Sequence, residues 1–128
     1  AAATVSAKIS ASTSFPNHSI SPHMLEMFRI FCERLSAEGV KLCFVIPSYH
    51  PTFYSLNGKN SAGKPIDNFA GYISGLEQME QTVRSIAETL SAAVIGSFHP
   101  EKYVAGDGEF FDWMHPKPSV FKRMFSNI

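Results

Sequence analysis

The stretch Val40-Lys41-Leu42-Cys43-Phe44-Val45-Ile46 decides the fold of this chain. Six of its seven residues are apolar, and the run has the length of a β-strand. A strand that is apolar at nearly every position is buried on both faces, which is typical of parallel sheets. Pro47 comes next and cannot extend the pairing of a central strand. The sequence therefore predicts a buried strand of a parallel sheet over residues 40–46.

A helix is expected directly before this strand. Ser21 is a favoured N-cap residue, and Pro22 suits the first helical position. Gly39 can take the left-handed conformation that ends a helix. The apolar residues between them recur every three or four positions, which predicts an amphipathic helix packed on the sheet. They are Met24, Leu25, Phe28, Phe31, Cys32 and Leu35.

A second helix–strand unit follows. Ser74 and Glu77 fit a capping box and predict a helix of about 17 residues. The apolar run over residues 92–96 predicts a second short, buried strand. Two strands that are joined through a helix should be parallel, with a right-handed crossover. Pro118 can start a last helix, whose apolar side is formed by Val120, Phe121, Met124 and Phe125.

Two segments have weaker patterns. Residues 1–20 are rich in Ala, Ser and Thr, and the alternation of Val5, Ala7 and Ile9 favours either a short edge strand or a loose arm. Residues 52–73 contain several Gly, Asn and Pro residues and predict an irregular connection. A connection of this length is either a lid over a pocket or a plain surface excursion.

The expected order of helix, strand, helix, strand and helix defines an α/β fold with a parallel sheet. Two apolar strands are too few to cover their own edges. We therefore expect further strands from an N-terminal half of the domain, or from a second chain. In this interpretation residues 1–20 are a loose N-terminal arm, and residues 21–128 are the C-terminal half of a larger α/β domain.

Charge and composition exclude some partners. The chain of 128 residues has 11 basic and 11 acidic residues, so a nucleic-acid or anionic-membrane partner has no electrostatic basis. No apolar run approaches the roughly 18 residues of a membrane-spanning helix. Cys32 and Cys43 are expected to be buried free thiols, and they leave the cellular compartment undetermined. We expect no cofactor.

Open parallel sheets bind ligands at the carboxyl ends of their strands. Tyr49 and His50 follow the first expected strand, and His99 follows the second. We therefore expect these three side chains to contact a substrate. Trp113 lies in the loop that follows, where it either holds the loop by packing or stacks on the substrate.

Asp112 and His115 in the same loop form the strongest chemical signal. A carboxylate three residues before an imidazole can accept its Nδ1–H and leave Nε2 free to take a proton from a hydroxyl. The competing interpretation is a zinc-type site, in which His50, His99 and His115 join Asp112 as ligands.

The chain resembles the SGNH (GDSL-type) hydrolase superfamily. The last block of that family is an Asp-x-x-His before the C-terminal helix, as in Phe111-Asp112-Trp113-Met114-His115-Pro116-Lys117-Pro118. The chain is also similar to SGNH-like proteins in which a strand ends in Pro-x-Tyr-His-Pro, here Val45-Ile46-Pro47-Ser48-Tyr49-His50-Pro51. The likeness runs from about Ser21 to Met124 and covers the back half of the family fold.

This resemblance implies a flavodoxin-like three-layer fold and a Ser-His-Asp esterase or acyltransferase. The substrate would be a small-molecule or glycan ester, with His115 as general base and Asp112 as its orienting carboxylate. The family's Gly-Asp-Ser nucleophile block, its oxyanion Gly block and its Gly-x-Asn-Asp block are missing from this chain. Ser48 and Ser97 are the local alternatives to a missing nucleophile. A non-catalytic binding module of the same fold is the rival function.

Overall fold

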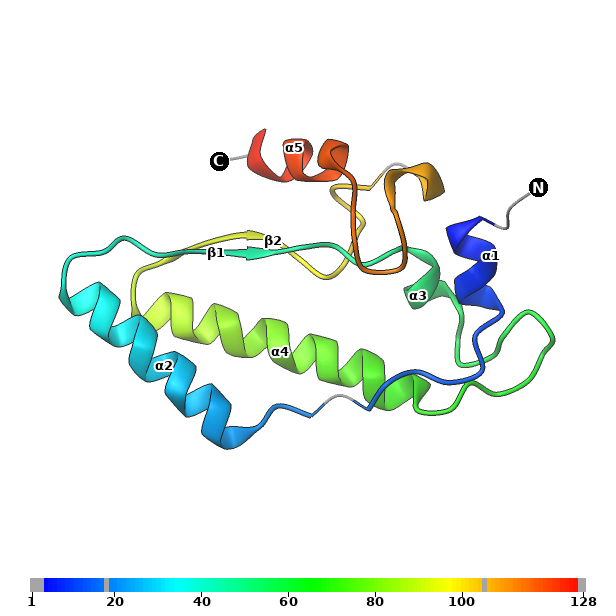
Figure 1. Ribbon diagram of the computed structural model, residues 1–128, viewed down its shortest axis with the longest axis horizontal. Coiled ribbons are helices and arrows are strands. Elements are labelled where there is room, and N and C mark those ends of the chain that lie inside the picture. Colours follow the sequence, from blue (N-terminus) through cyan, green and yellow to red (C-terminus); the bar gives the residue numbers. More distant parts are fainter. Residues whose placement is uncertain (1–3, 18, 105, 127–128) are drawn as a thin grey trace.

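The computed structural model describes residues 4–17, 19–104 and 106–126. Helices lie on both sides of a pair of strands: α2 and α4 are on one side and α5 is on the other (Figure 1). Along the chain the elements are α1 (Val5–Ser10), α2 (Pro22–Ala37), β1 (Cys43–Ile46), α3 (Thr52–Ser55), α4 (Phe69–Thr89), β2 (Ala93–Gly96), the 3₁₀ turn η1 (Asp107–Glu109) and α5 (Pro118–Ser126).

The strands β1 and β2 form a two-stranded parallel sheet, with Cys43 opposite Ala93 and Ile46 opposite Gly96. The connection between them contains α4, which packs on both strands, while α5 packs on β2. The predicted α/β class and the predicted parallel pairing are therefore confirmed. Two strands do not establish a flavodoxin-like sheet, which stays a prediction.

The start and end of α2 are those the sequence predicts. The Ser21 hydroxyl accepts a hydrogen bond from the Met24 N–H at 3.3 Å. At the other end, Gly39 has a φ of +85°, and the Val40 N–H donates to the Leu35 carbonyl at 3.0 Å. This is the Schellman pattern, which satisfies carbonyls that the helix end leaves without a partner.

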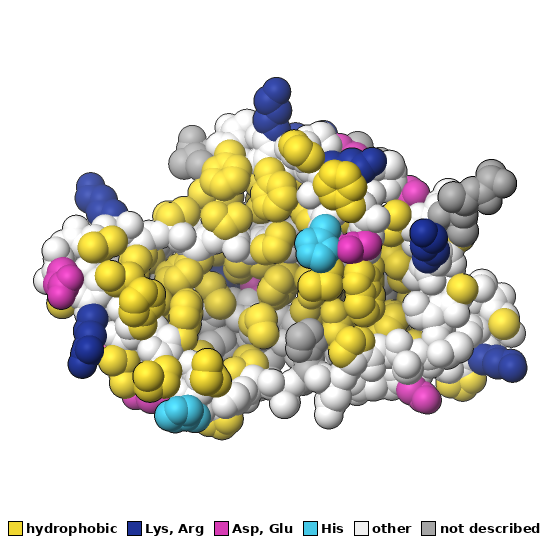
Figure 2. Space-filling model, in the orientation of Figure 1, with side chains coloured by type: hydrophobic (Ala, Val, Ile, Leu, Met, Phe, Trp, Pro, Cys, Tyr) yellow, Lys and Arg dark blue, Asp and Glu magenta, His cyan; other side chains and the backbone are white. Residues whose placement is uncertain are grey.

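The apolar face of α2 is less covered than predicted. Cys32 is buried, but Met24, Met27 and Phe31 are each more than half exposed. Phe28 contacts Phe44 of β1 at a ring-centroid distance of 5.9 Å. Hydrophobic side chains accordingly gather on the face seen in Figure 2, over α2 and the strand pair. Cys43 is also exposed, contrary to the prediction, because no strand among the described residues pairs with the outer edge of β1.

The short strand expected near the N-terminus is wrong, because Val5–Ser10 is the helix α1. The Thr4 hydroxyl caps it by accepting the Ala7 N–H at 3.1 Å. Ile9 and Phe15 are buried, so residues 4–17 pack against the rest of the chain and are not a loose arm. Residues 1–3 and 18 of the expected arm lie outside the described residues.

The helix α4 begins at Phe69, five residues before the capping box that predicted its start. Tyr72 is 1% exposed, and its burial in the core explains the additional turn. The connection before α4 is also more regular than expected. The Ser61 N–H donates to the Ser10 carbonyl at 2.7 Å, and the Phe15 N–H donates to the Asp67 carbonyl at 2.9 Å. These bonds fasten the connection to the last residue of α1 and to the segment after α1, which is not expected of a free lid.

The largest buried cluster is aromatic and lies beyond the carboxyl ends of the strands. Phe53 is completely buried and contacts Phe15, Tyr49 and Tyr72 with ring-centroid distances between 4.8 and 5.7 Å. These residues come from α3, α4, the segment after α1 and the segment after β1. The cluster therefore joins the N-terminal segment to the end of the sheet where the predicted site lies.

Gly96 at the end of β2 provides a test of the close packing of β1, β2 and α5. Its φ is +88°, and an added Cβ would lie 2.2 Å from the Ile46 carbonyl oxygen and 2.4 Å from Met124 Cε. We expect Gly96→Ala to lower the free energy of unfolding by about 3 kcal/mol or more, because backbone strain and a backbone clash add. Urea denaturation measures this loss as a lower midpoint concentration with an unchanged m-value.

Gly39→Ala is the matched control. Gly39 has nearly the same φ, +85°, but nothing lies within 4 Å of an added Cβ. This variant should lose only about 1–2 kcal/mol, the cost of the left-handed conformation alone. Equal losses in the two variants would contradict the close approach of β1, β2 and α5 at Gly96.

Candidate active site

The loop that carries Asp112 and His115 is a tight hairpin. Phe110 and Pro116 form an antiparallel bridge, and the Phe111 N–H donates to the His115 carbonyl at 3.0 Å. Outside this bridge the Lys117 N–H donates to the Glu109 carbonyl at 2.7 Å. The residues from 112 to 115 therefore stand at the tip of the hairpin, held by backbone pairing.

Asp112 and His115 meet at this tip. The His115 Nδ1 atom lies 2.7 Å from Asp112 Oδ2 and 2.9 Å from Oδ1. Asp112 Oδ1 also accepts the backbone N–H groups of Met114 and His115, each at 2.9 Å. Because the carboxylate can only accept, Nδ1 carries the proton of the neutral imidazole. His115 Nε2 has no hydrogen-bond partner among the described residues, and the side chain is 64% exposed.

Two opposing effects act on the pKa of Asp112. Partial burial raises it, but the hydrogen bonds from the Met114 N–H and from the His115 side chain and N–H outweigh burial and lower the pKa below its ordinary value. The carboxylate therefore stays charged through the neutral and mildly acidic range. A carboxylate of this kind can hold the imidazole in one tautomer and stabilise it when it takes a proton.

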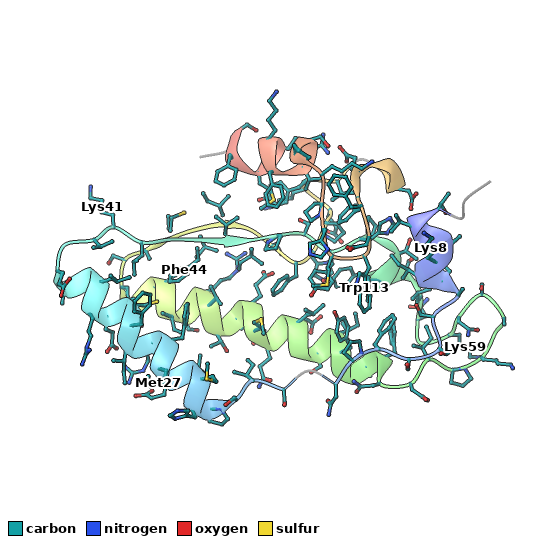
Figure 3. All side chains as sticks on the ribbon, viewed as in Figure 1. Lys8, Met27, Lys41, Phe44, Lys59 and Trp113 are labelled. Atoms are coloured by element: carbon teal, nitrogen blue, oxygen red, sulfur yellow. The ribbon has the colours of Figure 1, made fainter. Side chains whose placement is uncertain are left out.

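Trp113 fastens the loop to the core. Its ring stacks on Phe53 at 5.0 Å and on Tyr72 at 6.0 Å. Its carbonyl accepts the His50 N–H at 2.9 Å. Figure 3 shows Trp113 pointing from the loop towards the aromatic cluster, which supports the packing role given as one of the two alternatives for this residue.

Tyr49 and His50 were expected to contact a substrate, but the structure places both in the interior. The His50 Nδ1 atom accepts the Thr52 N–H at 3.1 Å, so Nε2 carries the proton and donates to Asp107 Oδ1 at 2.9 Å. The Tyr72 hydroxyl lies 3.4 Å from that of Tyr49, and burial raises the pKa of Tyr72. Tyr49 and His50 therefore support the site from the interior of the chain. They are not placed to contact a substrate, because their polar side-chain atoms already have hydrogen-bond partners.

His99 lies apart from the Asp112–His115 pair. Its ring stacks on Tyr54 at 4.0 Å, and it lines a separate cleft of about 130 Å³ with Glu77 and Arg84. The carboxyl end of β2 thus leads to a different part of the surface from the hairpin tip. The structure does not bring His99 to the pair.

The zinc-type interpretation is wrong for the described residues, where no three His, Cys, Asp or Glu side chains are grouped to hold a metal ion. His50 uses both of its ring nitrogens inside the core, and His99 faces another cleft. His50 and His99 both follow the carboxyl ends of the strands, but the His50 side chain pairs with Asp107 and the His99 side chain lines the cleft with Glu77 and Arg84.

Ser48 and Ser97 are occupied by structural hydrogen bonds. The completely buried Ser48 hydroxyl donates to the Ser97 carbonyl at 2.9 Å. The Ser97 hydroxyl donates to the Glu80 carboxylate at 2.9 Å and accepts the His99 N–H at 3.1 Å. Glu80 also accepts the Phe98 N–H at 2.7 Å. Neither hydroxyl has a hydrogen bond to His115, so neither is placed as a nucleophile.

The sequence did not reveal the surroundings of the pair. A cavity of about 260 Å³, open to solvent on one side, lies between α1 and the hairpin tip, and Asp112 is part of its wall. Lys8, Ile9 and Trp113 are among its other lining residues. No signal in the sequence pointed to this cavity, because α1 was expected to be a strand or a loose arm.

Comparison with protein-family models, with curated proteins and with solved structures finds no match for this chain. The resemblance to SGNH hydrolases therefore depends on the two sequence motifs alone. Within the described residues, no helix combines the length and the apolar character needed to cross a membrane.

The hydrogen-bond pattern at Asp112 predicts the tautomer of His115. We expect the neutral imidazole to carry its proton on Nδ1 in the wild-type chain, and Asp112→Ala to shift the proton towards Nε2 because the acceptor is lost. Nitrogen chemical shifts from ¹⁵N–¹H spectra of the imidazole distinguish the two forms. His23, exposed on α2, is the internal reference and should not respond to the change at Asp112. An unchanged His115 spectrum would contradict the pairing.

The lowered pKa of Asp112 predicts the acid behaviour of the loop. The folded pKa is below the unfolded value, so the stabilisation is present above the unfolded value and is lost as pH falls through the folded pKa. We expect the ¹³Cγ titration midpoint of Asp112 to lie below that of a model peptide. His115→Ala should raise this midpoint only in part, because the backbone N–H groups of residues 114 and 115 still donate to Asp112 Oδ1. A wild-type midpoint at or above the peptide value would contradict the pattern.

Proposed function

We propose that the Asp112–His115 pair is the base half of an SGNH-like serine esterase or acyltransferase that acts on an acyl group of a carbohydrate or similar substrate. The observation that carries the proposal is the bond from His115 Nδ1 to Asp112, on a histidine side chain that is 64% exposed. A general base needs a fixed tautomer, a free nitrogen that substrate can reach, and a partner that stabilises its protonated form.

In the proposed reaction, His115 Nε2 removes the proton of a serine hydroxyl as its oxygen attacks the ester carbonyl. Asp112 stabilises the imidazolium, which then gives the proton to the leaving alkoxide as the acyl–oxygen bond breaks. The acyl-enzyme is resolved by water or by an acceptor hydroxyl in the same way. The serine is proposed to come from polypeptide outside residues 1–128, because the family's nucleophile block is missing from this chain and the two strand-end candidates, Ser48 and Ser97, are engaged elsewhere.

The test is the hydrolysis of p-nitrophenyl acetate by the natural polypeptide that contains these residues. We expect His115→Ala and Asp112→Asn each to lower kcat/KM by about 100-fold or more, since general-base catalysis contributes on the order of 10²–10⁴. His23→Ala removes another exposed histidine, and it should leave the rate unchanged. A rate that is the same with and without His115 would end the proposal.

A non-catalytic binding module is the second candidate, and the paired hydroxyls of Ser48 and Ser97 favour it for this chain taken alone. In that case the 128-residue chain binds a glycan or polypeptide and is not labelled by a fluorophosphonate probe. Labelling of the isolated chain would reject this candidate.

We also propose that the polypeptide with the serine adds a parallel strand to the outer edge of β1. The Ala93 N–H donates to the Leu42 carbonyl, so alternate residues direct their backbone groups to β2, and Cys43 and Val45 direct theirs away from it. Val45 is 42% exposed at this edge. The exposed apolar side chains of α2 continue the same face, as expected for a surface that another strand or chain covers.

The isolated chain provides the test of this edge. We expect it to bind an apolar dye and to self-associate in sedimentation velocity, and we expect Met27→Glu with Phe31→Glu to suppress both. Phe125→Glu alters an exposed aromatic residue on α5 and should have little effect. A wild-type chain that sediments as a monomer and binds no dye would overturn the proposal.

A further inference from the structure

The cavity beside the hairpin tip is large enough to hold a small ligand. Its volume is about 260 Å³, and its apolar wall comes from Val5 and Ile9 of α1 and from Phe111 and Trp113 of the hairpin. A dry cavity of roughly 150 Å³ is known to hold a benzene molecule. This cavity therefore suits an apolar body of about six to ten non-hydrogen atoms.

One cation stands at the cavity. Lys8 lines it from the exposed side of α1 and forms no salt bridge within the described part of the chain. Figure 3 shows Lys8 on α1 and Trp113 on the neighbouring hairpin. Ser12 and Ser14 also line the cavity, and the Ser12 hydroxyl donates to the Lys8 carbonyl at 3.5 Å. An ammonium beside an apolar wall complements an anion with an apolar body.

The one anionic residue in the wall does not cancel this preference. Asp112 Oδ1 accepts two backbone N–H groups, and both carboxylate oxygens lie within 2.9 Å of His115 Nδ1. The Asp112 carboxylate is thus hydrogen-bonded to donors of its own loop. Lys8, by contrast, forms no salt bridge with Asp112 or with any other acidic side chain among the described residues.

We propose that this cavity binds a small apolar carboxylate, with the hydrocarbon body against Trp113 and Ile9 and the carboxylate paired with Lys8. The cavity adjoins the proposed reaction site, because Asp112 is part of its wall, but binding of the carboxylate requires neither a serine nor turnover. Loss of esterase activity would therefore leave it standing, and the absence of binding would leave the Asp112–His115 proposal standing.

The test uses hexanoate, hexan-1-ol and hexylammonium as probes of equal chain length. Trp113 is the only tryptophan of the chain, so its fluorescence reports on the cavity without a label. We expect saturable changes with hexanoate, weaker binding of hexan-1-ol and the weakest binding of hexylammonium. Lys8→Ala should weaken hexanoate about fivefold, the effect of one partly exposed ion pair, and should leave hexan-1-ol unchanged.

Two further variants complete the test. Ser12→Phe fills the cavity from its wall and should weaken hexanoate and hexan-1-ol alike by tenfold or more. Lys59→Ala removes a lysine from the connection before α4 and should change nothing. Thermal unfolding establishes that each variant is folded. The proposal is overturned if hexanoate gives no saturable signal with the wild-type chain, or if its preference over hexan-1-ol survives Lys8→Ala.

Discussion

The insertion of Trp113 into the aromatic cluster is the contact on which the arrangement of the site depends. The ring stacks on Phe53 and Tyr72, and the Trp113 carbonyl accepts the His50 N–H. Partial burial of an indole contributes on the order of 2–3 kcal/mol, enough to hold a short loop in one place. Because Asp112 and His115 flank this anchor, their side chains are presented at the surface by a residue that has no part in the proposed chemistry.

The same cluster explains why the N-terminal segment belongs to the site. Phe15 packs on Phe53, and Ile9 lies in the same buried group, which brings α1 beside the hairpin. The Ser6 N–H donates to Asp107 Oδ1, the oxygen that also accepts from His50. The carboxylate of Asp107 therefore joins α1, the segment after β1 and the turn before the hairpin. The cavity that Lys8 lines forms because these contacts hold α1 beside the hairpin.

The two sides of β1 differ in how closely other residues pack against them. On one side of β1, Gly96 allows the backbone of β2 to approach closely, with Met124 of α5 packed over it. On the other side, Cys43 and Val45 are exposed, and so is much of the apolar face of α2. The two strands thus approach closely at Gly96, while the outer edge of β1 exposes apolar side chains of the kind found in a core.

The sequence by itself determined the elements whose signals are local. The Ser21-Pro22 start of α2, its end at Gly39, the two apolar strands and the Asp-x-x-His geometry all depend on residues close together in the chain. Only the tertiary structure decided which side chains meet across long separations. His50 pairs with Asp107, His99 stacks on Tyr54, and α1 lines the cavity, because packing of the aromatic cluster sets the direction of each side chain and overrides the local pattern.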